Sequence, residues 1–385
     1  MKKDIFFIIA LGIILSIGIS FYNPWKGGGD FLAYWSAAHL FVHGGNPYNQ
    51  AEMSSLQYQI DPERFSLSTG LINAWNPPWL ILILLPIGLI PYAIAIPIWI
   101  FCNTFLIGMA LIITWKLCIG DQKSRGILFV YLAGFLFVET LSYLAIGQIT
   151  SLVLLGIVLF IWLLERDLDI LAGIALLLTT IKPHISYFFF LLVFIWIIQN
   201  HRWKVFVGFC LTALISLVIF WILIPSWVKD YALLVSSLPY NSVYTSTLGN
   251  FISEKFNISI FNFSAVLLIF IVKPLLKLIT KDGWLTTTNL ALLSSIPLSP
   301  FGFNFDQIVI LPAIVQIISW SSAHLVPRKS TIFVIISFIF FDLILLIMTS
   351  INGLEHYWFF WIPIALLGIY LTVWKKRNAS RKFTN

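Results

Sequence analysis

The chain has 385 residues, of which 59% are hydrophobic and only 10% are charged, and its mean hydropathy is +0.95. In a soluble globular domain about a quarter of the residues are charged, so this composition excludes that class. The formal net charge of +7 does not indicate nucleic-acid binding, because the distribution of the cations along the chain explains it better.

Apolar runs recur along the whole chain. A membrane-spanning helix needs about 20 such residues, and backbone polar groups in lipid must be satisfied within the segment, so long apolar runs indicate helices. The short alternating segments of a β-barrel are absent from the sequence. We predict an all-α fold, a polytopic transmembrane bundle of roughly 11–13 membrane helices in a single integral membrane domain, residues 1–385. The expected helices are residues 5–21, 78–89, 93–115, 127–145, 150–164, 170–180, 185–198, 205–224, 258–276, 286–296, 307–320, 331–348 and 357–374.

The first predicted helix, residues 5–21, follows two lysines and could imitate a signal peptide. No small-residue cleavage site comes after it, and Tyr22-Asn23-Pro24-Trp25 stands there instead. We therefore expect a retained first helix. A long polar loop, residues 22–76, follows it and should contain short interfacial helices.

Asp30 lies early in this loop, after three glycines and before the run Phe-Leu-Ala-Tyr-Trp-Ser-Ala-Ala. Only 16 of the 385 residues are acidic, so a carboxylate at a membrane surface is a scarce chemical resource. It suggests a general base that faces a substrate dissolved in the membrane. The other interpretation is a helix N-cap ahead of residues 31–40, and one residue can serve both purposes.

The same loop is rich in aromatic side chains. We expect a short amphipathic helix at the interface over residues 36–42, stopped by two glycines and followed by an Asn-Pro-Tyr turn. Aromatic rings stack on the apolar faces of sugars, while Tyr and Trp also anchor proteins in the lipid headgroup region. On the first interpretation the candidate substrate contacts are Tyr34, Trp35, Asn46 and Tyr48.

Two polar breaks interrupt the apolar helices in the middle of the chain. Gln148 follows Gly147 and either caps a helix break or contributes an amide to a site. Glu139, about two helical turns earlier, is an intramembrane carboxylate and hence a functional candidate. Lys182 stands between apolar helices, where an unpaired ammonium is costly. The anion expected beside it is a lipid phosphate, although its long side chain could instead snorkel to the headgroups.

Pro183 breaks the helix next to Lys182, and His184 beside it is a further candidate substrate contact. A third break, residues 299–307, contributes Asn304 and Asp306 as candidates, and Asp306 could also cap the following helix. Weaker candidates are Glu355 and His356.

No metal site or cofactor is predicted, because no HExxH-like or DxD spacing occurs, although a divalent metal is left open. The three cysteines lie in or beside apolar runs, which is typical of small buried hydrophobic residues: Cys102, Cys118 and Cys210.

The basic residues predict the topology. Seven short segments hold 18 of the 23 Lys and Arg residues, and we assign all seven segments, with both termini, to the cytoplasm. The polar stretches 22–76 and 225–257 then form two outer loops on the extracytoplasmic face. If residues 78–89 and 93–115 both crossed the membrane, the basic loop 116–125 would lie outside. We therefore expect residues 78–89 to form a partial or re-entrant helix; otherwise this loop breaks the rule.

Taken in order, these signals resemble glycosyltransferase family 87, membrane-embedded enzymes of the GT-C superfamily. The matching features are Asp30-x3-Tyr34-Trp35-x-Ala37-Ala38, Gly45-Asn46-Pro47-Tyr48, Pro77-Pro78 with Pro86, Gly147-Gln148, Ala172-Gly173 with Ile181-Lys182-Pro183, Arg202-Trp203, and Ser299-Pro300 with the stretch to Gln307. Members often carry Trp and His in that last segment, where this chain has Phe303, Asn304, Phe305 and Asp306.

The resemblance implies a function. The chain would move a sugar, mannose or another hexose, from a polyprenyl-phosphate donor to a hydroxyl of a lipid or glycan acceptor, with inversion at the anomeric carbon. Asp30 would be the general base, and Lys182 would bind the leaving phosphate. Two alternatives remain open. A secondary transporter would place charged residues near the midplane of internal repeats, and a ligase or polymerase of lipid-linked glycans would be expected to rely on Arg and His in outer loops.

Overall fold

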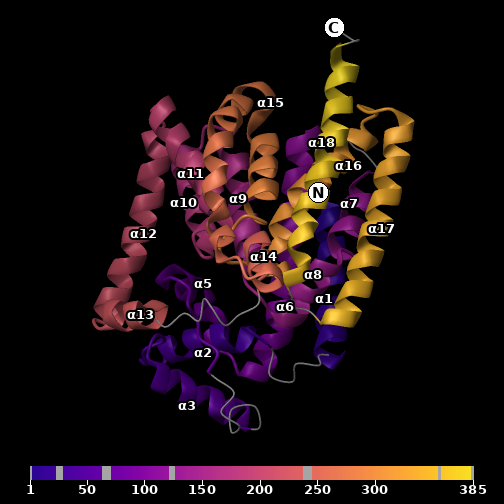
Figure 1. Cartoon of the computed structure of the whole chain (residues 1–385). Coiled ribbons are helices and arrows are strands. Elements are labelled where there is room, and N and C mark those ends of the chain that lie inside the picture. Colours follow the sequence, from indigo (N-terminus) through magenta and orange to yellow (C-terminus); the bar gives the residue numbers. More distant parts are fainter. Residues whose placement is uncertain are drawn as a thin grey trace.

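The computed structural model describes residues 2–22, 29–62, 71–120, 126–236, 245–353 and 357–382, and in these residues every regular element is a helix (Figure 1). The predicted all-α class is confirmed. Five residues named above lie outside the described part: Asn23, Pro24, Trp25, Glu355 and His356.

Seven helical stretches of the described part are long and apolar enough to cross a membrane, so this is a multi-pass membrane protein. They are formed by α1 (Lys2–Tyr22), α6 (Tyr92–Ile119), α11 (Pro183–Asn200), α12 (Trp203–Leu223), η2 (Asn304–Ile310) with α16 (Leu311–Ser322), α17 (Arg328–Asn352), and η3 (Tyr357–Phe360) with α18 (Trp361–Lys382).

An eighth span is made if α7 (Gly126–Phe135) and α8 (Val138–Ile146) are counted together. The sequence predicted one continuous helix over residues 127–145, and that prediction was wrong. The two helices are bent by 53° at the break, because Phe137 has an extended ψ of 122° that interrupts the helical hydrogen bonds.

Shorter apolar helices complete the bundle: α5 (Pro78–Gly88), α9 (Thr150–Leu164) and α10 (Asp169–Thr179). α5 has 11 residues, about 16 Å of helix, which is too short to span a bilayer. It packs on α2, and the indole Nε1 of Trp35 donates to the carbonyl of Ile90 just beyond its end at 2.9 Å. A partial helix at residues 78–89 is thus what the structure shows.

The first loop folds more fully than the sequence suggested. α2 (Phe31–Val42) begins five residues before the expected interfacial helix and buries most of its side chains against α3 and α5. Contrary to the expectation, the helix is not amphipathic, because α2 is apolar nearly all round and is covered on several sides. Its place at the interface stays a prediction. α3 (Gln50–Ile60) was not predicted; the Asn49 side chain caps it by accepting from the Ala51 N–H at 3.0 Å.

The second half contains α13 (Trp227–Ser236), α14 (Leu248–Phe256), η1 (Ser259–Leu268) and α15 (Ile269–Ser295). The helices expected over residues 258–276 and 286–296 correspond to η1 and the two arms of α15, which bends at Gly283. In Figure 1, α2, α3 and α13 lie at one end of the molecule, which we call the α2 end, and the C-terminus lies at the opposite end.

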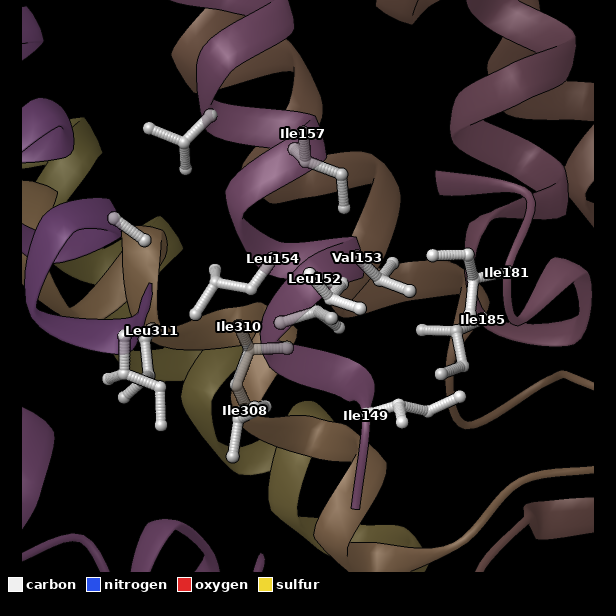
Figure 2. Close-up of a cluster of buried hydrophobic side chains, with 14 of the residues drawn as sticks. Ile149, Leu152, Val153, Leu154, Ile157, Ile181, Ile185, Ile308, Ile310 and Leu311 are labelled. Atoms are coloured by element: carbon white, nitrogen blue, oxygen red, sulfur yellow. The ribbon is translucent and has the colours of Figure 1, made fainter. Parts of the chain in front are cut away.

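The core is continuous around the first turns of α9. Figure 2 shows buried side chains from the start of α9, the start of α11 and η2 lying together, among them Ile149, Leu152, Val153, Leu154, Ile157, Ile181, Ile185, Ile308, Ile310 and Leu311. Close packing of this kind fixes the backbone of all three segments. Each of them carries a polar residue of the candidate site: Thr150, Lys182 and Asp306.

Candidate active site

The turn between α8 and α9 is held from a third helix. Gly147 ends α8 with a φ of 75°, a left-handed conformation that favours glycine. From α6, Trp99 Nε1 donates to the Gly147 carbonyl at 2.9 Å and Asn103 Nδ2 donates to the Gln148 carbonyl at 3.1 Å. This support fixes the backbone of Gln148 and thereby directs its side chain.

The Gln148 side chain is the centre of the site. Its Nε2 donates to Oδ2 of Asp30, while its Oε1 accepts from the Tyr34 hydroxyl at 3.0 Å and from the Lys182 ammonium at 2.6 Å. Gln148 is buried, and both ends of its amide are bonded, so the amide has one orientation. One side chain therefore connects the predicted base to the predicted phosphate ligand.

Asp30 occupies the N-cap position of α2, but its side chain makes no capping hydrogen bond. Its backbone N–H donates to the Ile146 carbonyl at 3.1 Å. Gly29 permits this approach, because its φ is 57° and a Cβ there would lie 2.5 Å from the same carbonyl oxygen. The half-buried carboxylate of Asp30 is thus turned toward Gln148.

Lys182 precedes Pro183 at the start of α11 and is buried, with 6% of its surface exposed. Its Nζ lies 2.6 Å from Oδ1 of Asp306 and 5.4 Å from the centre of the Phe305 ring. The side chain does not snorkel to the headgroups, because it points into the protein. The structure supplies a carboxylate as its anionic partner, and two of the three ammonium hydrogens are engaged.

Asp306 is 2% exposed and gathers several donors. Its Oδ1 also accepts from the Thr150 hydroxyl at 2.8 Å, and its Oδ2 lies 3.3 Å from Nε2 of His184. The Phe303 N–H donates to Oδ2 at 3.4 Å, so Asp306 also caps the first turn of η2. The capping role was predicted for the following helix, and the structure places it at η2.

The electrostatics of the cluster follow from these contacts. Burial and the neighbouring Asp30 carboxylate raise the pKa of Tyr34 well above its ordinary value. Tyr34 therefore stays protonated and keeps donating to Gln148. The cluster holds two carboxylates, Asp30 and Asp306, and Lys182 is ion-paired with Asp306.

The structure thus brings together six of the residues predicted from sequence: Asp30, Tyr34, Gln148, Lys182, His184 and Asp306. It places Trp35 and Tyr48 elsewhere. The Trp35 ring stacks on His39 at 4.5 Å and faces α5. The Tyr48 hydroxyl donates to the Asn76 carbonyl at 3.0 Å, and its ring is buried among other aromatic side chains.

Asn46 and Asn304 also lie outside the cluster. Asn46 Nδ2 donates to Oδ2 of Asp230 at 2.6 Å and thereby connects the first loop to α13. Asn304 is fully buried, and its Nδ2 donates to Oε2 of Glu139 at 2.8 Å. Both amides are engaged in packing contacts, and we do not include them in the proposed site.

Sequence reasoning missed several supporting residues. Asn103, Tyr143 and Thr150 are fully buried and polar, and none of them was proposed. The Tyr143 hydroxyl lies 2.8 Å from the Gln148 carbonyl oxygen and 2.6 Å from Oδ1 of Asn103. One sequence signal was available for Asn103, which is the single Asn or Gln in residues 92–119. Polar side chains inside membrane helices commonly have a partner, so an isolated amide there predicts one.

The structure also gives information on metal binding and on an apolar cavity. In the part of the chain that the structure describes, no three or more His, Cys, Asp or Glu side chains form a group that could hold a metal ion. An apolar cavity of about 490 Å³ lies between α5, α9, α10 and α12. It is lined by Trp79, Leu82, Ile83, Leu159, Leu163, Leu171, Ile174, Ala175, Leu177, Leu178, Thr212 and Ser216.

The fold and the site define a membrane-embedded protein with a buried polar cluster at one end of its helix bundle. The family model of glycosyltransferase family 87 matches residues 75–296, more than half of the chain. The chain belongs to glycosyltransferase family 87 and is a membrane glycosyltransferase. The matched region contains Gln148, Lys182 and His184, while Asp30 and Asp306 lie outside it. Comparisons with curated proteins and with solved structures gave no match.

Proposed function

We propose that the chain transfers a sugar, mannose or another hexose, from a polyprenyl-phosphate donor to a hydroxyl of a lipid or glycan acceptor, with inversion. The observation that carries this proposal is the Gln148 side chain, which bonds Asp30 at one end and Lys182 at the other. A base and a cation for the leaving group are thereby held side by side. Membership of a glycosyltransferase family favours this reaction over secondary transport.

Asp30 suits the role of base better than Asp306 does. Asp306 is almost fully buried and is ion-paired with Lys182, so its lone pairs are already taken up. Asp30 is half-buried, and a base must reach the proton that it removes. The donation from Gln148 holds the Asp30 carboxylate in one orientation.

Lys182 and His184 suit the leaving phosphate. The third N–H of the Lys182 ammonium and the partly exposed imidazole of His184 both belong to the first turn of α11. Positive charge placed where negative charge develops in the transition state is usually the largest catalytic term. In the reaction, Asp30 takes the acceptor proton, the acceptor oxygen bonds to the anomeric carbon, and the bond from that carbon to the phosphate oxygen breaks.

The apolar cavity supports a lipid-linked donor. Its lining includes Leu177 and Leu178, which lie about one helical turn before Lys182 along the chain. The cavity lies among helices that carry exposed apolar side chains, such as Leu171 and Leu214. We propose that a hydrocarbon chain binds in this cavity with its phosphate end directed toward Lys182.

The charge distribution supports an extracytoplasmic site. The described cations of the predicted cytoplasmic segments lie at or near helix ends, for example Lys116, Arg166, Arg202 and Arg328. Positive residues in short connections mark the cytoplasmic side. With both termini in the cytoplasm, the first loop and Asp30 face outward.

The decisive experiment incubates purified protein with defined polyprenyl-phosphate sugars and an acceptor, and measures released polyprenyl phosphate. Release that requires the acceptor and disappears in Asp30→Asn supports the proposal. Equal release by the variant removes Asp30 as the base. If none of the donors is used, while nucleotide sugars are, the proposed donor class is wrong. Uptake of substrate by proteoliposomes without transfer would instead support a transporter.

A further inference from the structure

A second buried polar pair lies between α8 and η2, outside the cluster described above. Glu139 and Asn304 are both 0% exposed, and Asn304 Nδ2 donates to Glu139 Oε2 at 2.8 Å. The other oxygen of each side chain, Glu139 Oε1 and Asn304 Oδ1, is buried and has no hydrogen-bond partner among the described residues. Two adjacent side chains thus each lack one hydrogen bond, and buried polar atoms without partners are rare and costly.

An ionised Glu139 would be hard to sustain at this position. None of the ion pairs among the described residues includes it. Of the elements packed on α8, α17 brings a second carboxylate, Asp342, into electrostatic contact with it, and the Val138 N–H bonds that carboxylate. η2 brings Asp306, whose charge Lys182 already balances. In the described parts of α6 and α7, no charged side chain acts on Glu139. An isolated buried carboxylate costs far more than a neutral acid.

We propose that Glu139 carries a proton and forms a two-bond ring with the Asn304 carboxamide. In this ring, Oε1–H donates to Asn304 Oδ1 while Asn304 Nδ2 donates to Oε2. One proton then forms a hydrogen bond between the two unpartnered oxygens, and it removes the buried charge. An ionised Glu139 has no hydrogen to donate, so Asn304 Oδ1 gains a donor from Glu139 only when Glu139 is protonated.

The ring joins the two segments that present partners to Lys182. α8 leads from Glu139 to the Gly147 turn and Gln148, and η2 leads from Asn304 to Asp306 two residues later. Both Gln148 and Asp306 accept hydrogen bonds from the Lys182 ammonium. Glu139 is therefore a positioning residue for Lys182, an assignment that rests on the proposed function of that lysine.

The protonation state can be measured without any activity. Infrared spectra of wild-type protein and Glu139→Gln at neutral pH should differ by a carboxylic-acid C=O stretching band, above the amide I band, that only the wild type shows. The same band should persist in Asp342→Asn. If the two spectra differ only in the carboxylate region, Glu139 is ionised and the proposal fails. A melting temperature that rises with sodium or potassium would likewise overturn it, because a cation would then supply the missing partner.

The positioning role has its own test. Glu139→Gln can form the same two-bond ring and should keep activity within about threefold of the wild type, whereas Glu139→Leu should lose about tenfold or more. The unfolded chain releases the Glu139 proton at a lower pH than the folded wild type does, so between those two pH values the melting temperature should fall as pH rises. Glu139→Gln should lack that fall. Equal activity of the Gln and Leu variants would refute positioning, and the infrared and melting data still apply if no transfer is detected.

Discussion

Two ion pairs of this protein use the same chemistry in different surroundings. Arg202 bonds the carboxylates of Asp169 and Asp167, and the exposed side-chain fractions are 30% for Arg202, 10% for Asp169 and 85% for Asp167. Lys182 bonds Asp306, and their side chains are 7% and 2% exposed. Water screens the Arg202–Asp167 contact, which should contribute at most about 1 kcal/mol to stability, and it screens the bidentate contact with the nearly buried Asp169 less. The Lys182–Asp306 pair is buried, so water screens it much less.

The difference in exposure bears on whether each pair suits stability or the proposed reaction. A buried pair repays its desolvation only with excellent geometry and further hydrogen bonds, and apolar residues of similar size often stabilise a fold as well or better. Around Lys182 those further bonds are present, from Gln148 and Thr150. The Arg202 pair joins α10 to α12 as a surface contact. The Lys182 pair has an arrangement suited to charge that changes during a reaction.

The largest effect is expected when the proposed general base, Asp30, is replaced. Asp30→Asn should lower the transfer rate by about 10²–10⁴-fold, the usual contribution of a general base. The Asn side chain has a similar shape, so insertion into the membrane and the melting temperature should stay close to those of wild type. Initial rates and thermal unfolding of both proteins in the same detergent measure this. A rate within threefold of wild type would contradict the assignment.

Removing the buried cation separates stability from chemistry. Lys182→Ala leaves Asp306 charged and uncompensated, which typically costs about 3–5 kcal/mol of folding free energy, and donor use should be lost with it. The double variant Lys182→Ala/Asp306→Ala removes both charges and should recover much of the melting temperature without recovering transfer. Recovery of transfer together with stability would mean that Lys182 acts only in folding.

A change at Gln148 should shift a pH profile. Gln148→Glu can still accept from Tyr34 and Lys182, but it places a second carboxylate against Asp30 in place of a donor. A like charge favours the protonated form of Asp30, so its pKa should rise and the acid limb of kcat/KM should move to higher pH by about one unit. Gln148→Leu should lower activity at every pH. A profile of Gln148→Glu that overlays the wild type would show that Gln148 does not act on Asp30.

The smallest effect is expected at Arg202. Arg202→Gln should leave transfer unchanged and should lower stability by about 1 kcal/mol, less than Lys182→Ala does, and the part due to the exposed Asp167 should decrease as salt is raised. Melting temperatures at low and high ionic strength check this. A large loss of activity would mean that the Arg202 contacts and the Lys182 cluster are coupled, which would contradict their separate roles.

The sequence predicted the helices well where apolar runs were long and uninterrupted. It predicted Asp30, Gln148, Lys182 and Asp306 as functional candidates because charged and amide groups are scarce in such a chain. It did not predict that Lys182 pairs with Asp306, since these residues are 124 positions apart and only the packing of α9 against α11 and η2 brings them together.

Other sites were missed for a different physical reason. Trp35 and Tyr48 were proposed as sugar contacts, but an aromatic ring that packs against helices has the same sequence signature as one that faces a ligand. The burial of α2 could not be inferred either. The helices that cover it are α3 and α5, and α3 lies in a polar loop whose sequence does not predict this contact. Asn103 supports Gln148 from a distant position on α6, and Tyr143 supports it from α8, the helix that precedes it.

The single amide of Gln148 has a consequence for how two substrates are recognised. A phosphate that draws the Lys182 ammonium toward itself weakens the bond to Gln148 Oε1, and the Nε2 end of the same amide holds Asp30. On the proposed function, donor occupancy and the proton affinity of the base therefore share a coupling free energy, which acts equally in both directions. The affinity for donor should then depend on whether Asp30 is protonated, and one side chain carries that dependence.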